Sequence, residues 1–158
     1  GRRILSALDI DPDRPLSTQE RVLSPSDFGF HNAIRRPEGS LAFVDFEYFG
    51  WDDPAKMIAD FVLHPAMALG DQQKREFVRG LLARLPEAQR LEKRLPVAYA
   101  LFGVKWSLIL LNEFVPGHLA RRRFAGDDRE RAEVLSGQLA KAQGMLRRVL
   151  DTFPEFPY

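Results

Sequence analysis

The sequence changes character at Pro54, and that change limits the folds open to the chain. Before Pro54 the apolar residues occur in short runs, interrupted by proline, glycine and aspartate, as in short strands and turns. After Pro54 they recur at three- and four-residue spacing over long segments, as on one face of a helix. The sequence therefore predicts a single α+β domain over residues 1–158 that is mostly helical, with no internal repeat.

The part before Pro54 is expected to hold a connector and one β-hairpin. Aspartate and proline crowd the stretch up to Glu20 and oppose a regular helix. Two strand-like runs follow, joined by Pro37-Glu38-Gly39-Ser40, whose proline and glycine suit a tight reversal. The expected elements are a connector over residues 1–20, an extended run over 21–23, a loop over 24–29 and hairpin strands over 33–36 and 41–44.

The part after Pro54 is expected to form a helical subdomain over residues 55–158. The predicted helices cover residues 55–63, 71–85, 97–115 and 127–153. Asp127 and Asp128 would cap the last of them and favour the positive end of its dipole. Its core stripe would consist of Val134, Leu135, Leu139, Ala142, Leu146, Val149, Leu150 and Phe153.

The apolar segment 97–115 is long enough to cross a bilayer. Lys105 lies at its centre, where a lysine costs about 2.5–3.5 kcal/mol in a membrane. Pro96 and Pro116 stand at its two ends, as at ordinary helix boundaries. We therefore expect a buried core helix and no membrane partner.

The charge and the cysteine content exclude several kinds of partner and site. The 23 basic and 22 acidic residues leave a net charge of +1, so no broad field would attract nucleic acid. The chain has no cysteine, which excludes disulfides, zinc thiolates and cysteine nucleophiles and is compatible with a cytoplasmic location.

Three residues between the connector and Pro54 have the spacing of a phosphotransferase site. Asp27 and Asn32 are five positions apart, as are the catalytic aspartate and metal-binding asparagine of kinases. Asp45 directly follows the second hairpin strand, which would return it towards Asn32. Asp27 would accept the proton of an attacking hydroxyl, while Asn32 and Asp45 would offer the hard oxygen ligands that Mg²⁺ prefers.

Two segments carry a resemblance to the aminoglycoside phosphotransferase family, which also includes choline, homoserine and sugar kinases. Residues 26–32, Ser-Asp-Phe-Gly-Phe-His-Asn, resemble its catalytic loop, and residues 44–54, from Val44 to Pro54, resemble its metal-site segment. Asp60 stands where the family has an aspartate that opens its helical subdomain. The resemblance implies a kinase-like carboxy-terminal lobe that uses Mg²⁺ and ATP or GTP to phosphorylate a hydroxyl of a small molecule, without indicating which one.

The sequence departs from the family in ways that bear on activity. Pro25 and Gly29 replace two common histidines beside Asp27. The 158 residues contain no glycine-rich loop and no strand lysine to hold nucleotide phosphates. We therefore expect this chain alone to be inactive and its exposed apolar surface to be covered by an amino-terminal lobe or by self-association. A non-catalytic binding or scaffold module is the alternative.

The remaining polar and aromatic residues are assigned structural roles. Asp27 itself could be only a turn residue. Asp53 is expected to order its loop, and Asp60 to form a cap or an ion pair. His31, His64 and His118 are expected to be isolated from other metal ligands, Arg121, Arg122 and Arg123 to form a solvated surface, and Tyr48, Phe49 and Trp51 to pack against helices.

Overall fold

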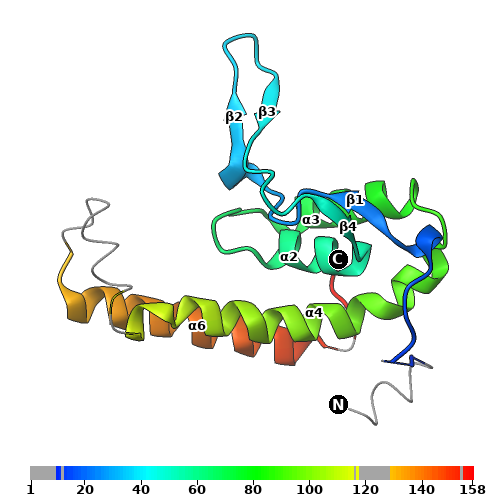
Figure 1. Ribbon diagram of the computed structural model, residues 1–158. Helices are drawn as coiled ribbons and strands as arrows, with labels where there is room; N and C mark the ends of the chain where they lie inside the picture. The colour runs from blue at the N-terminus through cyan, green and yellow to red at the C-terminus, as the bar shows by residue number, and fades with distance from the viewer. Residues whose placement is uncertain (1–9, 12, 116, 118–128, 154) are drawn as a thin grey trace.

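A computed structural model describes residues 10–11, 13–115, 117, 129–153 and 155–158, and it confirms an α+β fold that is mostly helical. Figure 1 shows a projecting hairpin, a compact middle layer and two long helices running side by side beneath it. The strands are β1 (Val22–Ser24), β2 (Ala33–Arg35), β3 (Leu41–Phe43) and β4 (Gly50–Asp52), and the α-helices are α2 (Pro54–Leu63), α3 (Asp71–Leu82), α4 (Ala88–Leu110) and α6 (Arg131–Thr152). Short 3₁₀ turns cover Thr18–Glu20, Phe30–Asn32 and Asn112–Phe114.

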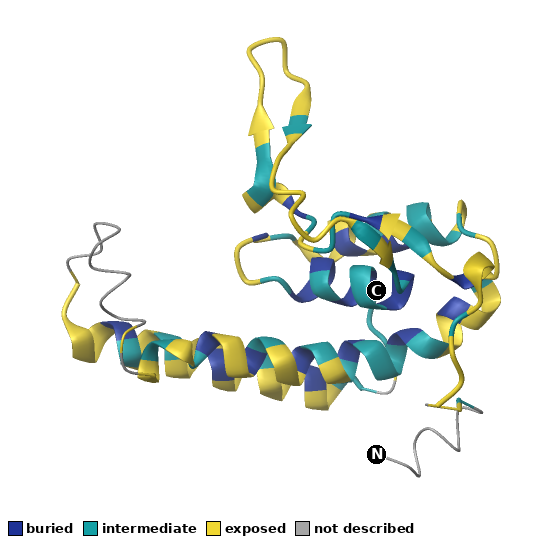
Figure 2. Cartoon of the chain, viewed as in Figure 1, coloured by how far each residue is buried: buried dark blue, intermediate teal, exposed yellow. Residues whose placement is uncertain are grey.

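The predicted hairpin is confirmed as the antiparallel pair of β2 and β3. Ala33 lies opposite Phe43, and Arg35 lies opposite Leu41. Gly39 adopts a φ of 90° at the turn, a conformation that glycine reaches without steric strain. The pair extends away from the helices with little burial, as Figure 2 shows.

A second two-stranded sheet joins β1 to β4, and the latter strand was not predicted. Leu23 lies opposite Trp51, and Ser24 lies opposite Gly50. The segment Gly50–Asp52 is short and is followed by an aspartate and a proline, so its sequence is typical of a turn. Pairing with β1 overrides that local preference and returns the chain to the start of α2.

The core forms where α2 packs on α4. Asp53 caps α2 by accepting a hydrogen bond from the Ala55 amide at 2.8 Å, and Pro54 occupies the first turn, where its missing N–H is not needed. Ile58 and Val62 on α2 are fully buried, as are Leu95 and Tyr99 on α4. The four-residue spacing within each pair places the partners on one helix face.

The boundaries predicted from Pro96 and Pro116 were wrong at the amino-terminal end. The helix α4 begins at Ala88 and contains Pro96, while Pro116 lies outside the described residues. Proline removes one backbone hydrogen bond from the helix, and burial of Leu91 and Leu95 on either side of that bond offsets the loss. Residues 88–114 are long and apolar enough to cross a membrane by length and composition alone, which is weak evidence for such a role.

The predicted stripe of α6 was wrong for three of its eight members. Val134, Ala142 and Val149 are buried as expected, and Leu135 and Phe153 are partly buried. Leu139, Leu146 and Leu150 are exposed, as are apolar residues of α4. The exposed apolar residues of the two helices are Leu101, Val104, Leu108, Ile109, Leu139, Leu146 and Leu150. The predicted caps Asp127 and Asp128 lie outside the described residues.

The described part of the connector contains no α-helix, as predicted, and one buried acid fixes its end. Glu20 is buried, and both of its carboxylate oxygens bind the Arg14 guanidinium, at 2.5 and 3.0 Å. The Ser17 amide donates a third hydrogen bond at 2.9 Å. These donors, with the Arg14 hydrogen bond as the largest cause, lower the pKa of Glu20 to about 2.

Glu20→Gln is predicted to reduce stability at neutral pH and to flatten its acid dependence. A lowered folded-state pKa contributes stability that is complete above the unfolded value of about 4.5 and is lost as the pH falls towards 2. Urea unfolding between pH 7 and pH 2 measures the difference. Glu92→Gln, on an exposed position of α4, is the matched control and should keep the wild-type slope. Equal slopes for wild type and Glu20→Gln would contradict the assignment.

Gly103→Ala is predicted to destabilise the contact between α4 and α6. A Cβ at Gly103 would lie 2.4 Å from Cγ2 of Val149, so overpacking should cost about 1–3 kcal/mol against about 1 kcal/mol gained in helix propensity. Adding Val149→Ala should recover part of the overpacking loss. Gly137→Ala, which meets no atom within 4 Å, should leave stability unchanged or raise it in the same unfolding experiment.

Candidate functional site

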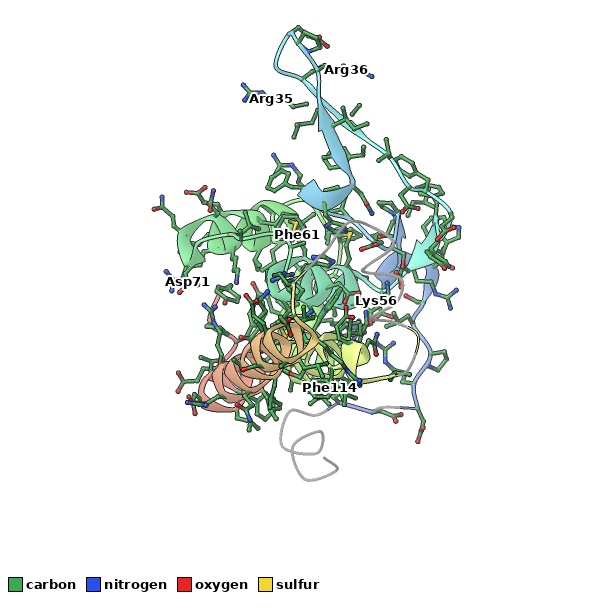
Figure 3. All side chains as sticks on the ribbon, turned by 90° about the vertical axis from the view of Figure 1, so that its left-hand side faces the viewer. Arg35, Arg36, Lys56, Phe61, Asp71 and Phe114 are labelled. Carbon is green, nitrogen blue, oxygen red and sulfur yellow. The ribbon has the colours of Figure 1, made fainter. Side chains whose placement is uncertain are left out.

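The loop that carries Asp27 is held by the next side chain, Phe28. The Phe28 ring lies 5.6 Å from the ring of Phe61 on α2 and 6.3 Å from that of Phe77 on α3, and those two rings stack at 3.6 Å. Figure 3 shows Phe61 in the interior of the molecule. The chain bends at Ser26 and Asp27, and while Phe28 packs inward, half of the Asp27 side chain is exposed.

Gly29 allows two side chains to approach the loop closely. A Cβ at Gly29 would lie 2.6 Å from Sδ of Met67 and 2.7 Å from the ring of His31. The Met67 sulfur also accepts a hydrogen bond from the Phe30 amide at 3.1 Å. Packing therefore requires Gly29 at this position.

Asn32 is tied directly to the Asp27 segment. Its Nδ2 donates a hydrogen bond to the Asp27 carbonyl oxygen at 3.0 Å. Because the amide nitrogen is used in this way, the Oδ1 atom of Asn32 is the one left to act as a ligand. The contact is to the Asp27 backbone and leaves the Asp27 carboxylate to other partners.

The hairpin returns Asp45 to the level of Asn32. The Val44 amide donates to the Asn32 carbonyl at 2.9 Å, which extends the β2–β3 pairing by one step. Asp45 is the next residue, and its φ of 63° turns the chain sharply at that point. Its exposed side chain has no hydrogen bond or ion pair within the part of the chain that the structure describes. Such a strained non-glycine position is often found at functional sites.

The prediction that His31 and His64 are isolated was wrong, and His118 lies outside the described residues. Ligand atoms of Asp27, His31 and His64 all lie within 4.8 Å of one another. Nε2 of His31 is 3.0 Å from Oδ1 of Asp27, and the two imidazoles stack at 3.9 Å with an interplanar angle of 2°. The fold brings together His31 and His64, which are 33 positions apart, and the sequence pattern did not predict this contact.

The stacked arrangement of the His31 and His64 rings favours mutual support of the two rings over joint coordination of one metal ion. An imidazole nitrogen binds a metal along a lone pair in the ring plane, and two parallel rings direct their lone pairs into separate planes. Burial, followed by the nearby His31, lowers the pKa of His64 and keeps its ring neutral. Its Nδ1 accepts a hydrogen bond from the Ala66 amide at 3.2 Å. His64 therefore supports His31, which in turn holds the Asp27 carboxylate.

Lys56 connects the other side of the loop to α2, and the sequence analysis missed it. Its ammonium donates to Oγ of Ser26 at 2.8 Å and to Oδ2 of Asp52 at 2.5 Å, with Asp60 3.8 Å away. Ser26, next to Asp27, has a φ of 66°. The four-residue spacing of Asp52, Lys56 and Asp60 was the signal that could have revealed this network.

Asp60 forms the ion pair predicted for it, whereas Asp53, predicted to order its loop, caps and anchors a helix. Asp53 caps α2 and forms an ion pair with Arg94 of α4. Asp60 accepts hydrogen bonds from Lys105 at 2.8 Å and from the Trp106 indole at 3.0 Å. Both acids thus join α2 to α4, beneath the loop that carries Asp27.

The aromatic residues after Asp45 do not pack against helices, contrary to expectation. Tyr48 is 70% exposed, Phe49 is 53% exposed and Trp51 is 62% exposed. They belong to a set of exposed apolar residues on β1 to β4 and their connections. Its other members are Leu23, Phe30, Ile34, Leu41, Phe43, Val44 and Phe46. The predicted Arg121, Arg122 and Arg123 surface lies outside the described residues.

Comparisons of the chain with protein-family models, with curated proteins and with solved structures found no significant match in any of the three.

Lys56→Met is predicted to loosen the loop that carries Asp27. The substitution keeps the aliphatic stem but leaves Asp52 and Asp60 without their shared cation, which should cost about 1–3 kcal/mol of stability. Urea unfolding gives the loss, and amide exchange at Ser26 and Asp27 reports the loop. Lys93→Met, at an exposed position on α4, should change neither quantity. Unchanged exchange in Lys56→Met would contradict the role of this network.

Proposed function

We propose that this chain is the carboxy-terminal catalytic and acceptor-binding part of a kinase-like phosphotransferase. In this proposal the parent enzyme transfers a phosphoryl group from ATP or GTP to a hydroxyl of a small molecule. The observation that supports it is that Asn32 binds the Asp27 carbonyl through Nδ2 and accepts a hydrogen bond from Val44, the residue before Asp45, so both segments adjoin the base of one hairpin. Asp27, Asn32 and Asp45 are all residue types that phosphotransferases use, and they occur at the spacing found in those enzymes.

The two proposed metal ligands fit Mg²⁺ by chemistry and by availability. Oδ1 of Asn32 is left free by the hydrogen bond that its amide nitrogen makes, and the Asp45 carboxylate is exposed without a partner in the described part of the chain. Both offer hard oxygen atoms. When bound, the ion would neutralise charge on the phosphates of the nucleotide.

Asp27 would serve as the base for the acceptor hydroxyl. The hydroxyl oxygen would form a bond to the γ-phosphorus while the bond from that phosphorus to the β,γ-bridging oxygen breaks. The proton of the hydroxyl would pass to the Asp27 carboxylate and then to solvent. His31, 3.0 Å away, would hold that carboxylate in position, so this chain uses His31 where Pro25 and Gly29 replace the histidines common in the related family.

A non-catalytic scaffold module is the second candidate, and the exposed apolar surfaces favour it. Large apolar residues are exposed both around β4 and along α4 and α6, as expected where another lobe or chain covers them. Either an amino-terminal lobe or self-association would cover them. A glycine-rich loop and a lysine encoded upstream in the gene would favour the enzyme, whereas a start codon near Gly1 would favour the scaffold.

We predict that the isolated chain binds Mg²⁺ and nucleotide weakly and shows no turnover. Nucleotide positioning needs a phosphate clamp, which these 158 residues lack, and a general base alone contributes about 10²–10⁴-fold. Calorimetric titration with Mg²⁺ and ATP or GTP, and an assay on a panel of hydroxyl compounds, test this. Turnover that Asp27→Ala abolishes would contradict the prediction of silence while supporting the assignment of Asp27.

Asp45→Asn is predicted to weaken the Mg²⁺ binding that the chain retains, because it removes the only formal charge among the proposed ligands. Asn32→Ala should also weaken it, and Asp27→Asn should have a smaller effect. Asp151→Asn, an exposed acid on α6, is the matched control and should leave the calorimetric titration unchanged. Equal affinities in Asp45→Asn and wild type would remove the metal site from the proposal.

A further inference from the structure

Lys74 is a buried cation with no acidic partner close to its ammonium. Only 8% of the residue is exposed, although it lies on α3, whose other residues are mostly solvated. Its Nζ donates one hydrogen bond, to the Tyr158 hydroxyl at 3.3 Å, and lies 4.9 Å from the centre of that ring. Within the described part of the chain, no carboxylate lies within 4.0 Å of it. Buried charges in proteins are ordinarily paired, so this one needs an explanation.

The nearest carboxylate is already engaged. Asp71, one turn earlier on α3, binds the Arg148 guanidinium of α6 at 2.6 Å. Figure 3 shows Asp71 at the edge of the molecule, at the start of α3. Burial, with Arg148 as the next cause, lowers the pKa of Lys74, and Asp71 opposes that shift. The surroundings therefore disfavour the positive charge that lysine normally carries.

The Lys74 side chain lines a pocket of about 350 Å³ whose wall comes from α2, α3, α4, α6 and the carboxy-terminal segment. Three cations contribute to its wall, namely Lys74, Lys141 and Arg148, and none of the acidic residues that the structure describes does. The rest of the wall is mainly apolar, formed by Val62, Leu63, Pro65, Leu110 and Met145 with the ring of Tyr158. A ligand pocket of this size, near the lower limit of the usual range of about 300–1,000 Å³, suits a small organic molecule.

We infer that this pocket binds a small organic carboxylate, whose anionic group pairs with Lys74 and whose hydrocarbon part lies on the apolar wall. The carboxylate would supply the missing counter-charge and accept the ammonium hydrogens that Tyr158 does not use. Lys141, exposed at the wall and without an ion pair among the described residues, would add attraction. The inference does not depend on the proposed phosphotransfer, because the pocket shares no wall residue with the Asp27 site.

The test uses hexanoate as the probe, with neutral hexanamide as its uncharged counterpart and inorganic phosphate as an anion without an apolar part. Calorimetry should show saturable hexanoate binding, at least about tenfold tighter than binding of either comparison compound, since a hydrogen bond to a charged group contributes roughly 1.5–3 kcal/mol. NMR should shift the methyl signals of Val62, Leu63, Leu110 and Met145. Equal affinity for hexanoate and hexanamide, tighter binding of phosphate, or no saturation would each overturn the inference.

Two variants test the pocket itself. Lys74→Met keeps the length and packing of the side chain and should lower hexanoate affinity at least about tenfold. Gly144→Phe should block the pocket without disturbing α6, because a Cβ at Gly144 meets no atom within 4 Å. Lys93→Met, on α4 and outside the pocket, is the control that should bind as wild type does. Full affinity in a folded Gly144→Phe variant would also overturn the inference, even if Lys74→Met failed to fold.

Discussion

Insertion of Phe28 between the hairpin and the stacked rings of Phe61 and Phe77 is the contact on which the candidate site depends. The loop from Ser24 to Asn32 has little regular hydrogen bonding of its own. The packing of the Phe28 ring therefore fixes the position of this loop relative to α2 and α3. Phe28 also lies 5.0 Å from the ring of Phe43 on β3. One side chain therefore sets the position of Asp27 on one side and of the strand leading to Asp45 on the other.

The helix α2 connects this loop to the rest of the molecule through charged residues at its exposed edge and apolar residues at its buried face. Lys56 reaches up to Ser26, whereas Asp60 reaches across to Lys105 and Trp106. The same helix buries Ile58 and Val62 against α4. The loop, α2 and the core are therefore connected by direct contacts. A change at the α2–α4 contact would also change the position of Asp27.

Short sequence patterns predicted the elements whose formation depends on interactions between neighbouring residues. The hairpin followed from its proline-glycine turn, and α2 from the helical spacing of apolar residues after Pro54. The five-residue spacing of Asp27 and Asn32 suggested a shared site but did not predict the hydrogen bond between them. The rest depended on contacts between distant segments. Strand β4 exists because β1 pairs with it, α4 continues through Pro96 because its flanks are buried, and His31 meets His64 only when α2 is in place. The stripe of α6 was too wide because a periodic pattern shows that a face is apolar but not that a partner covers it.

Asn32 and Asp45 flank the two ends of the β2–β3 hairpin. Their strands are paired from Ala33 to Phe43, and the Val44–Asn32 hydrogen bond closes the base, so neither end can shift along the chain without breaking that ladder. Figure 1 shows the hairpin extending away from the helices, with only its base close to them. A tilt of the whole hairpin would carry both oxygen ligands together and leave their separation unchanged. The Asn32–Asp27 hydrogen bond and the contact between the Phe28 and Phe43 rings would make the Asp27 loop follow such a tilt, so the base and the ligands would move as one group.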